Sequence, residues 1–152
     1  MKRLLALVMA TVPAAVFGVV SPAQAALPVF YFSRIQYDSP GSDTRSAASL
    51  NAEWFKLTNS TTKPQQLRNF SVKDAAGKTY KFAVSTVVAP KSSIVVHTGR
   101  GSSGAPNSWD RYWGSGNYIW NNPGDTAKLY TPSGAVLDSC KWTRVSPGAT
   151  NC

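Results

Sequence analysis

The chain has 152 residues, of which 43% are apolar and 15% charged, and it includes ten prolines, eleven glycines and five tryptophans. This length suits one domain of ordinary size, and this composition excludes a disordered chain. One histidine, two cysteines and seven acidic residues leave few groups for metal binding or acid–base catalysis. Sixteen basic residues give a formal net charge of +9, which favours anionic partners but also serves solubility.

The first 25 residues have the pattern of a secretory signal peptide. Lys2 and Arg3 precede an apolar run over residues 4–20, and the segment ends in Ala-Gln-Ala at 23–25, a pattern that signal peptidase cleaves. The run is short for a membrane span and contains helix breakers, so an uncleaved anchor is the less favoured alternative. We therefore expect a secreted domain over residues 26–152, with 16 − 2 = 14 basic and seven acidic residues, a net of +7.

Downstream of this segment the chain has the pattern of short strands separated by turns. Residues 30–37 are aromatic and β-prone, and residues 53–59 alternate, with Phe55 and Leu57 on one face and Lys56 on the other. Further strands are expected at 70–72 and 80–82 (a hairpin with its turn at 74–77), 94–97, 118–120, 127–130 and 135–137. Seven to nine such strands, without a sustained helical period, predict an all-β sandwich, with a small barrel as the alternative.

Cys140 and Cys152 are the two cysteines of the chain. In an oxidising compartment only one intramolecular disulfide is possible, and it would tie the C-terminus to the strand that carries Cys140. A metal site is not indicated, because the chain has one histidine and no C-x-x-C motif. An intermolecular bridge through Cys152 is the remaining alternative.

Five motifs, taken in chain order, resemble those of the lamin tail domain family. They are NAEWFKLTN at 51–59, LRNFSVKDAAG at 67–77, YKF at 80–82, VHTG at 96–99 and WNNPGDTAKL at 120–129. The family commonly has Gly-Trp where this chain has Asn69-Phe70. The resemblance covers roughly residues 29–137, and the chain is most similar to small secreted bacterial members. It implies an immunoglobulin-like β-sandwich that serves as a binding or scaffolding module, attached in other members to nucleases or other hydrolases.

Two groups of residues are candidates for binding an anionic polymer. Lys56, Lys73 and Lys81 each alternate with apolar positions, and they would share one face if their strands are neighbours in one sheet. The second group is an aromatic and basic segment that could stack on sugars or bases: Trp109, Arg111, Tyr112 and Trp113. Packing of Trp113 and Trp120 in the core is the favoured alternative, because a small domain needs large buried residues.

Other motifs suggest chemistry more weakly. Residues 99–104 match G-x-G-x-x-G after a strand, but no helix is expected to follow, so a nucleotide site is not predicted. His97 lacks an identifiable partner, which favours a structural or surface role. Glu53 is expected to be a surface carboxylate or one that flanks a strand. Three aspartates in turns are weak calcium candidates, although turns also favour Asp for its own hydrogen bonds: Asp38, Asp43 and Asp125.

Together these features predict a secreted, non-catalytic β-sandwich module that binds extracellular or envelope polymers without a cofactor. The expected partners are anionic polysaccharide, wall polymer or extracellular DNA. One alternative is a small extracellular hydrolase that uses Glu53, the loop aspartates or His97. The other is a structural protein that associates with itself. A hydrolase requires acidic groups that converge in a cleft, whereas a binding module requires an exposed basic or aromatic patch.

Overall fold

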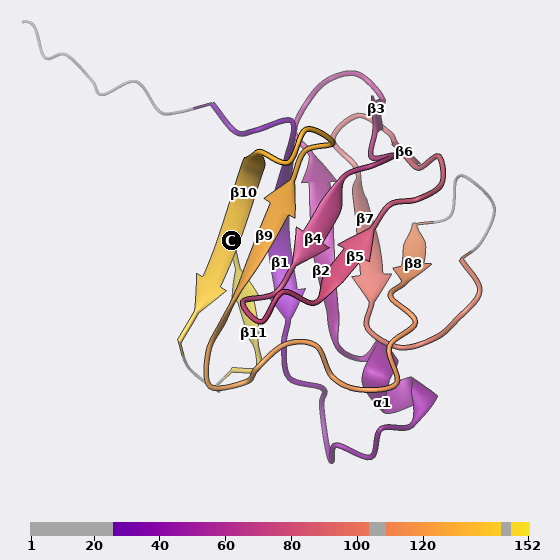
Figure 1. Cartoon of the computed structure of the whole chain (residues 1–152), viewed down its shortest axis with the longest axis vertical. Helices are drawn as coiled ribbons and strands as arrows, with labels where there is room; N and C mark the ends of the chain where they lie inside the picture. Colours follow the sequence, from indigo (N-terminus) through magenta and orange to yellow (C-terminus); the bar gives the residue numbers. More distant parts are fainter. Residues whose placement is uncertain (1–25, 104–108, 144–146) are drawn as a thin grey trace, which may run out of the picture.

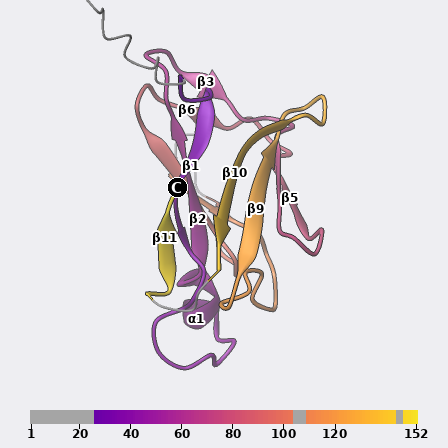
Figure 2. The same ribbon diagram turned by 90° about the vertical axis from the view of Figure 1, so that its left-hand side faces the viewer.

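The computed structural model describes residues 26–103, 109–143 and 147–152, and the expected signal segment at 1–25 lies outside these ranges. The described residues form eleven strands and one five-residue helix. Two sheets pack face to face, as the side view in Figure 2 shows, and a short separate pair of strands lies at one end (Figure 1). Within the described ranges, no helix has the length and apolar character needed to cross a membrane.

The first sheet has five strands in the order β11-β1-β2-β7-β8. In that order they are Ala149–Asn151, Phe30–Gln36, Trp54–Asn59, Ser93–His97 and Asp110–Tyr112. All neighbouring pairs are antiparallel except β7 and β8, which run parallel. A register shift interrupts β1 between Phe32 and Arg34.

The second sheet has four strands in the order β10-β9-β4-β5, and all its pairs are antiparallel. In that order they are Val136–Trp142, Asp125–Tyr130, Ser71–Lys73 and Thr79–Lys81. The separate pair joins β3 (Gln65–Gln66) to β6 (Val87–Val88). The one helix, α1 (Ala47–Asn51), begins after Ser46, whose side chain accepts a bond from the backbone N–H of Ser49.

The core lies between the two sheets and is strongly aromatic. Alternation along each strand directs one set of side chains inward, so Phe55 and Leu57 of β2 are both fully buried. The Phe55 ring lies near the centre of the core, with its centroid 5.9 Å from that of Phe32 and 6.1 Å from that of Trp120. Trp120 is 3% exposed, so the expectation that it packs in the core is confirmed.

The sandwich prediction is confirmed, and most of the expected strands are present. Residues 118–120 are the exception, because they form an extended loop instead of a strand. Ile119 and Trp120 are buried there, and their backbone N–H groups donate to the Glu53 side chain rather than to a neighbouring strand. The apolar and aromatic character of this segment therefore reflects burial of its side chains and not pairing with a strand. Five elements were not expected from the sequence, namely α1, β3, β6, β8 and β11.

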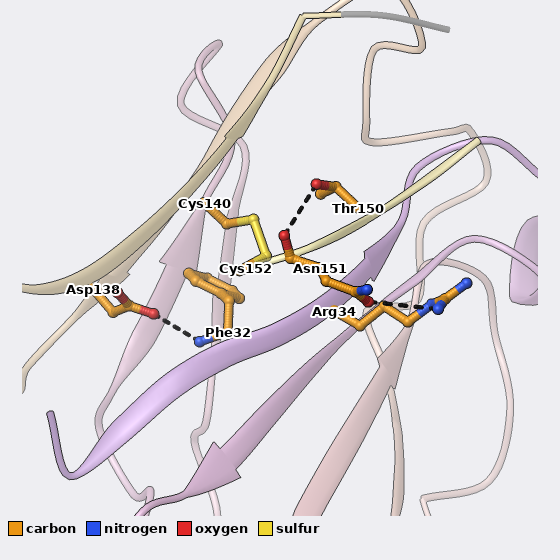
Figure 3. The surroundings of a disulfide bond; sticks show 7 residues. All are labelled: Phe32, Arg34, Asp138, Cys140, Thr150, Asn151 and Cys152. Carbon is orange, nitrogen blue, oxygen red and sulfur yellow. Dashed lines mark hydrogen bonds between the residues drawn. A yellow bond between two sulfur atoms is a disulfide. The ribbon is translucent and has the colours of Figure 1, made fainter. Parts of the chain in front are cut away.

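A disulfide joins Cys140 and Cys152, as predicted, with their Cα atoms 5.6 Å apart. Cys140 lies in β10 and Cys152 directly follows β11, so the bond connects the edge strands of the two sheets (Figure 3). On the same side of the sandwich, the Asp138 carboxylate of β10 accepts the backbone N–H of Phe32 at 2.7 Å. This N–H lies where the register of β1 shifts, so the carboxylate satisfies a donor next to the irregularity.

Candidate functional site

Two of the three predicted lysines lie on one outer face, and the third does not. Lys73 in β4 and Lys81 next to Phe82 both neighbour buried residues of the second sheet, so both side chains lie on its outer side. Lys56 belongs to β2 of the first sheet, on the opposite side of the sandwich. The shared face required all three strands to be neighbours in one sheet, and this condition is not met. Lys56 instead lies near Trp54, with its Nζ atom 5.6 Å from the ring centroid.

Two lysines that the sequence analysis did not select complete the basic face. Lys128 of β9 lies between the buried residues Ala127 and Leu129, and Lys141 of β10 alternates with buried residues in the same way. Both are exposed. We call the outer side of the second sheet, with Lys73, Lys81, Lys128 and Lys141, the lysine face. Alternation alone indicates that these residues point outward, but it does not say which strands are neighbours.

None of the seven acidic residues of the chain is exposed on the lysine face, and all seven are among the described residues. Asp74 and Asp125, at the ends of β4 and β9, are both 5% exposed. Asp138 turns toward the first sheet to reach Phe32. Among the described residues, no lysine of the face takes part in an ion pair. The face therefore carries four positive charges without an exposed acidic neighbour.

A recess of about 320 Å³ lies at the Asp74 end of the lysine face. Lys73 and Lys128 stand directly opposite each other on β4 and β9, and both line the recess. The Nζ atom of Lys73 lies 5.0 Å from the ring centroid of Tyr130, which also lines it. Like charges directly opposite each other destabilise a pair of strands, so an anion placed between these two lysines would offset an unfavourable contact.

The structure divides the aromatic segment that was predicted to stack on sugars or bases. Arg111 is 3% exposed, and Trp113 packs against the core, as the favoured alternative expected. Tyr112 lies on the outer side of β8 and stacks on His97 with 5.2 Å between ring centroids. Trp109 is 55% exposed and lines a separate, mainly apolar cavity of about 210 Å³. These four residues therefore do not form one binding surface.

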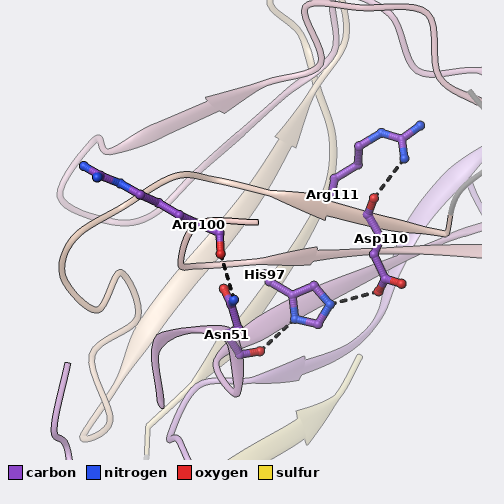
Figure 4. A network of polar contacts seen from close by, with 5 residues as sticks. All are labelled: Asn51, His97, Arg100, Asp110 and Arg111. Atoms are coloured by element: carbon purple, nitrogen blue, oxygen red, sulfur yellow. Dashed lines mark hydrogen bonds and ion pairs between the residues drawn. The ribbon is translucent and has the colours of Figure 1, made fainter. Parts of the chain in front are cut away.

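His97 of β7 connects the neighbouring strand β8 and the helix α1, as Figure 4 shows. Its Nδ1 atom lies 2.7 Å from the carbonyl oxygen of Asn51 at the end of α1, and its Nε2 atom lies 2.9 Å from a carboxylate oxygen of Asp110 in β8. Both ring nitrogens thus face acceptors. In this geometry neither nitrogen is free to accept a proton from a serine. His97 therefore has a structural role, since it holds the end of α1 and β8 next to β7.

Two of the three glycines of the G-x-G-x-x-G match, Gly99 and Gly101, have a packing role, and the third, at position 104, lies outside the described residues. A Cβ atom on Gly99 would lie 2.4 Å from the side-chain oxygen of Asn51 and 2.9 Å from the Cβ atom of Leu50. A Cβ atom on Gly101 would lie 2.3 Å from the ring of Tyr112. Gly99 and Gly101 allow the chain after β7 to pass close to α1 and to Tyr112, which explains these two glycines without a nucleotide.

Glu53 is a buried residue, which corrects the expectation of a surface carboxylate. It is 1% exposed, and its Oε1 atom accepts bonds from Thr98 Oγ1 at 2.6 Å and from the backbone N–H of Ile119 at 2.8 Å. A longer bond comes from the N–H of Trp120. Burial raises the pKa of Glu53 to about 7, although these hydrogen bonds favour the charged form. Alternation places Glu53 inward with Phe55, but the sequence does not reveal its donors.

The three aspartates considered for calcium have different surroundings. The Asp125 carboxylate accepts the backbone N–H groups of Ala75 and Thr126 on one oxygen and the backbone and side chain of Asn121 on the other. Asp38 accepts the side-chain amide of Asn122, and Asp43 is exposed. Within the part of the chain that the structure describes, no three His, Cys, Asp or Glu residues gather as a metal site. Asp125 thus holds neighbouring turns together.

These features define a two-layer β-sandwich module whose second sheet has a lysine-rich outer face. The family model of the lamin tail domain matches residues 23–144, and the chain therefore belongs to this family. The immunoglobulin-like sandwich that the sequence motifs implied is the observed fold. A comparison of the sequence with curated proteins finds no match.

Proposed function

We propose that this protein is a secreted, non-catalytic module that binds extracellular or envelope polyanions through the lysine face. The observation that carries the proposal is the gathering of four lysines on the outer side of one sheet without an exposed acidic residue. Ammonium groups attract polymers that carry phosphate, sulfate or carboxylate groups, mainly through charge. The proposed binding partners are acidic polysaccharide, an anionic wall polymer and extracellular DNA.

Secretion is part of the proposal and has two supports. The first 25 residues have the composition of a signal peptide. The disulfide between Cys140 and Cys152 suits an oxidising compartment, where such bonds form and persist.

The two alternative functions have less support. A hydrolase that uses His97 would need a free ring nitrogen, and both nitrogens face acceptors. A hydrolase that uses Glu53 would need an accessible carboxylate, and this residue is 1% exposed. Association of two copies through the lysine face would bring like charges together, which is unfavourable.

The test measures retention of the secreted protein on an anionic polymer at several salt concentrations. One variant changes the lysine face to glutamine, with Lys73→Gln, Lys81→Gln, Lys128→Gln and Lys141→Gln. The control variant removes the same number of positive charges elsewhere, with Arg34→Gln, Lys56→Gln, Lys63→Gln and Arg68→Gln. We expect the face variant to lose retention and most of its salt dependence, since each phosphate-type contact contributes a log–log slope of roughly 0.7–0.9.

The control variant distinguishes binding through the lysine face from attraction that depends only on the net charge of the protein. We expect it to keep most of the retention, because its changed residues lie outside the four strands of the second sheet. Equal losses in the two variants would mean that net charge alone governs retention, and this result would contradict the proposal. Retention of the face variant at the level of the parent would contradict it as well.

A further inference from the structure

We infer that a recess beside α1 is a binding site for a small organic anion, a carboxylate or phosphate group joined to an apolar group of a few carbons. We call it the arginine recess. Its volume of about 280 Å³ is just below the usual range for small-molecule sites, so it suits a compact ligand. The inference goes beyond the proposed function, because none of the lining residues belongs to the second sheet. They are Arg45, Ala47, Leu50, Arg100, Ser115 and Gly116.

Two arginines supply the positive charge of the arginine recess. Arg45 and Arg100 are both exposed, and neither takes part in an ion pair among the described residues. Asp43 is only two residues before Arg45, but the two side chains do not pair. The Nε atom of Arg100 lies 3.5 Å from the carbonyl oxygen of Gly114, at the limit of a hydrogen bond. A guanidinium group is a planar fork of donors that fits a carboxylate or a phosphate, so both arginines offer unused donors to such a group.

The backbone positions of both arginines are fixed by hydrogen bonds at the two ends of α1. The carbonyl oxygen of Arg100 accepts the side-chain amide of Asn51, the last residue of α1, at 2.9 Å. Figure 4 shows the Arg100 side chain pointing away from Asn51 and His97. Arg45 lies two residues before α1, and its backbone N–H donates to the hydroxyl oxygen of Tyr118 at 3.4 Å. Binding therefore has to order only the two side chains, which limits its entropic cost.

Arg45 has an unfavourable backbone conformation that packing does not explain. Its φ of 56° lies in the left-handed region, which glycine and asparagine adopt more readily than arginine. Lys91 has a similar φ of 55°, but its side chain donates to the carbonyl oxygen of Ser60 and so stabilises its own loop. The exposed Arg45 side chain has no such contact among the described residues. Strained residues are concentrated at binding sites, and a ligand that uses the guanidinium group would account for an arginine here.

The base of the arginine recess is apolar. Ala47 and Leu50 are three residues apart on α1, so they lie on one face of the helix, and Leu50 is 5% exposed. Gly116 has no side chain, and a Cβ atom there would meet no atom within 4 Å, so this part of the recess is open. An inorganic anion would leave the apolar base in contact with water, whereas a short alkyl group would cover it. The lining therefore favours an organic anion over free phosphate or sulfate.

The test titrates the secreted protein with isovalerate, a carboxylate with a branched alkyl group, and follows amide chemical shifts by NMR. We expect shifts at Ala47, Arg100 and Gly116, and binding about tenfold tighter than that of acetate, because the alkyl group leaves water. The neutral isovaleramide should cause no shifts, since it lacks the charge. Isopentyl phosphate is the second probe, and the tighter of the two anions identifies the preferred head group. Equal shifts with isovalerate, acetate and isovaleramide would overturn the inference, as would shifts confined to other residues.

Two variants each remove one guanidinium group from the recess, Arg45→Asn and Arg100→Gln. Asparagine tolerates the left-handed conformation, so Arg45→Asn should fold as well as the parent. We expect each variant to bind isovalerate about tenfold more weakly, because charge-assisted hydrogen bonds are lost. Arg34→Gln and Arg68→Gln are the matched controls, because each removes an exposed arginine outside the recess, and they should stay within about twofold of the parent. Equal losses in all four variants, or no loss in Arg45→Asn and Arg100→Gln, would overturn the inference.

The variant that changes the four lysines keeps this inference separate from the proposed function. It should bind isovalerate like the parent, whereas Arg45→Asn should be retained on an anionic polymer like the parent. Loss of isovalerate binding in the four-lysine variant alone would place the anion on the lysine face and reject the arginine recess. If Arg45→Asn and Arg100→Gln lose isovalerate while the four-lysine variant keeps its retention on the polymer, the proposed function fails and the arginine recess stands.

Discussion

Glu53 shows how much the surroundings of one residue determine its chemistry. Its carboxylate lies under the segment at 119–120 and binds two of that segment's backbone N–H groups. In sequence it resembles an ordinary residue before a strand, beside Trp54 and near Lys56. Burial raises its pKa from the ordinary value of 4.5 to about 7, so it holds a proton in the folded state over a range in which the unfolded chain releases it.

The free energy of unfolding should therefore depend on pH through Glu53. Below about pH 4.5 both states hold the proton and the full stability is present. Between pH 4.5 and about 7 the unfolded state gains by releasing its proton, so stability falls as pH rises and becomes constant above 7. At about 1.4 kcal/mol per pH unit, the loss is at most about 3–4 kcal/mol.

Glu53→Gln should remove this contribution, because a glutamine does not titrate. The measurement is urea unfolding of the parent and the variant at pH 4, 5.5 and 8. The difference between the two free energies of unfolding should shift in favour of the variant as pH rises. Other acidic groups act on both proteins alike and cancel in that difference. A difference that stays constant with pH would show that Glu53 does not titrate in this range.

The surroundings of the aspartates are likewise determined by folding and not by the local sequence. Asp125 and Asp138 accept backbone N–H groups from distant parts of the chain, and Asp74 accepts one from its own turn. The sequence shows only that acids are present in turns and strands. Their donors become neighbours through folding, so a carboxylate that resembles a metal ligand in sequence serves as a hydrogen-bond acceptor for the backbone.

At the scale of elements, alternation predicted the central strands well. The expected segments at 30–37, 53–59 and 94–97 correspond to β1, β2 and β7. These strands are buried on one face, so their sequence carries a period of two. The strands β8 and β11 are three residues long and, unlike the equally short β4 and β5, they have a polar residue at the central position, so their sequence does not indicate a strand. Each forms by hydrogen bonding to a longer strand of the first sheet, β8 to β7 and β11 to β1.

Close contact between α1 and the end of β7 depends on Gly99. Gly99→Ala should lower the free energy of unfolding by about 1–3 kcal/mol, because the new methyl group would clash with Asn51 and Leu50. Gly116→Ala is the control, since a Cβ atom there meets no atom within 4 Å. Denaturant unfolding of both variants tests this. Equal stability of Gly99→Ala and Gly116→Ala would contradict the proposed packing role.

At the scale of the whole molecule, the disulfide joins the edges of the two sheets. Cys140 in β10 and Cys152 after β11 are 12 residues apart in sequence. The double variant Cys140→Ser, Cys152→Ser should lose about 3 kcal/mol of stability, because a loop of this length gives the unfolded chain that much additional freedom. The measurement is urea unfolding of the oxidised parent and the variant.

Reduction of the parent with dithiothreitol provides the control for this prediction. The reduced parent and the double variant should unfold at the same urea concentration, since both lack the bond. A variant as stable as the oxidised parent would mean that the sheets hold together along this edge without the disulfide, through contacts such as that of Asp138 with Phe32.

The sequence by itself determined the fold class, the family motifs, the one intramolecular disulfide that two cysteines allow, and the outward position of Lys56, Lys73 and Lys81 on their strands. These properties follow from local alternation, from turn residues and from the presence of only two cysteines. Only the tertiary structure decided which lysines share a face, because alternation fixes the side of a strand but not its neighbours. It separated Lys56 from Lys73 and Lys81 and brought Lys128 opposite Lys73. It likewise buried Glu53 and brought the backbone N–H groups of Ile119 and Trp120 to its carboxylate, because hydrogen-bond partners far apart in sequence meet only in the folded chain.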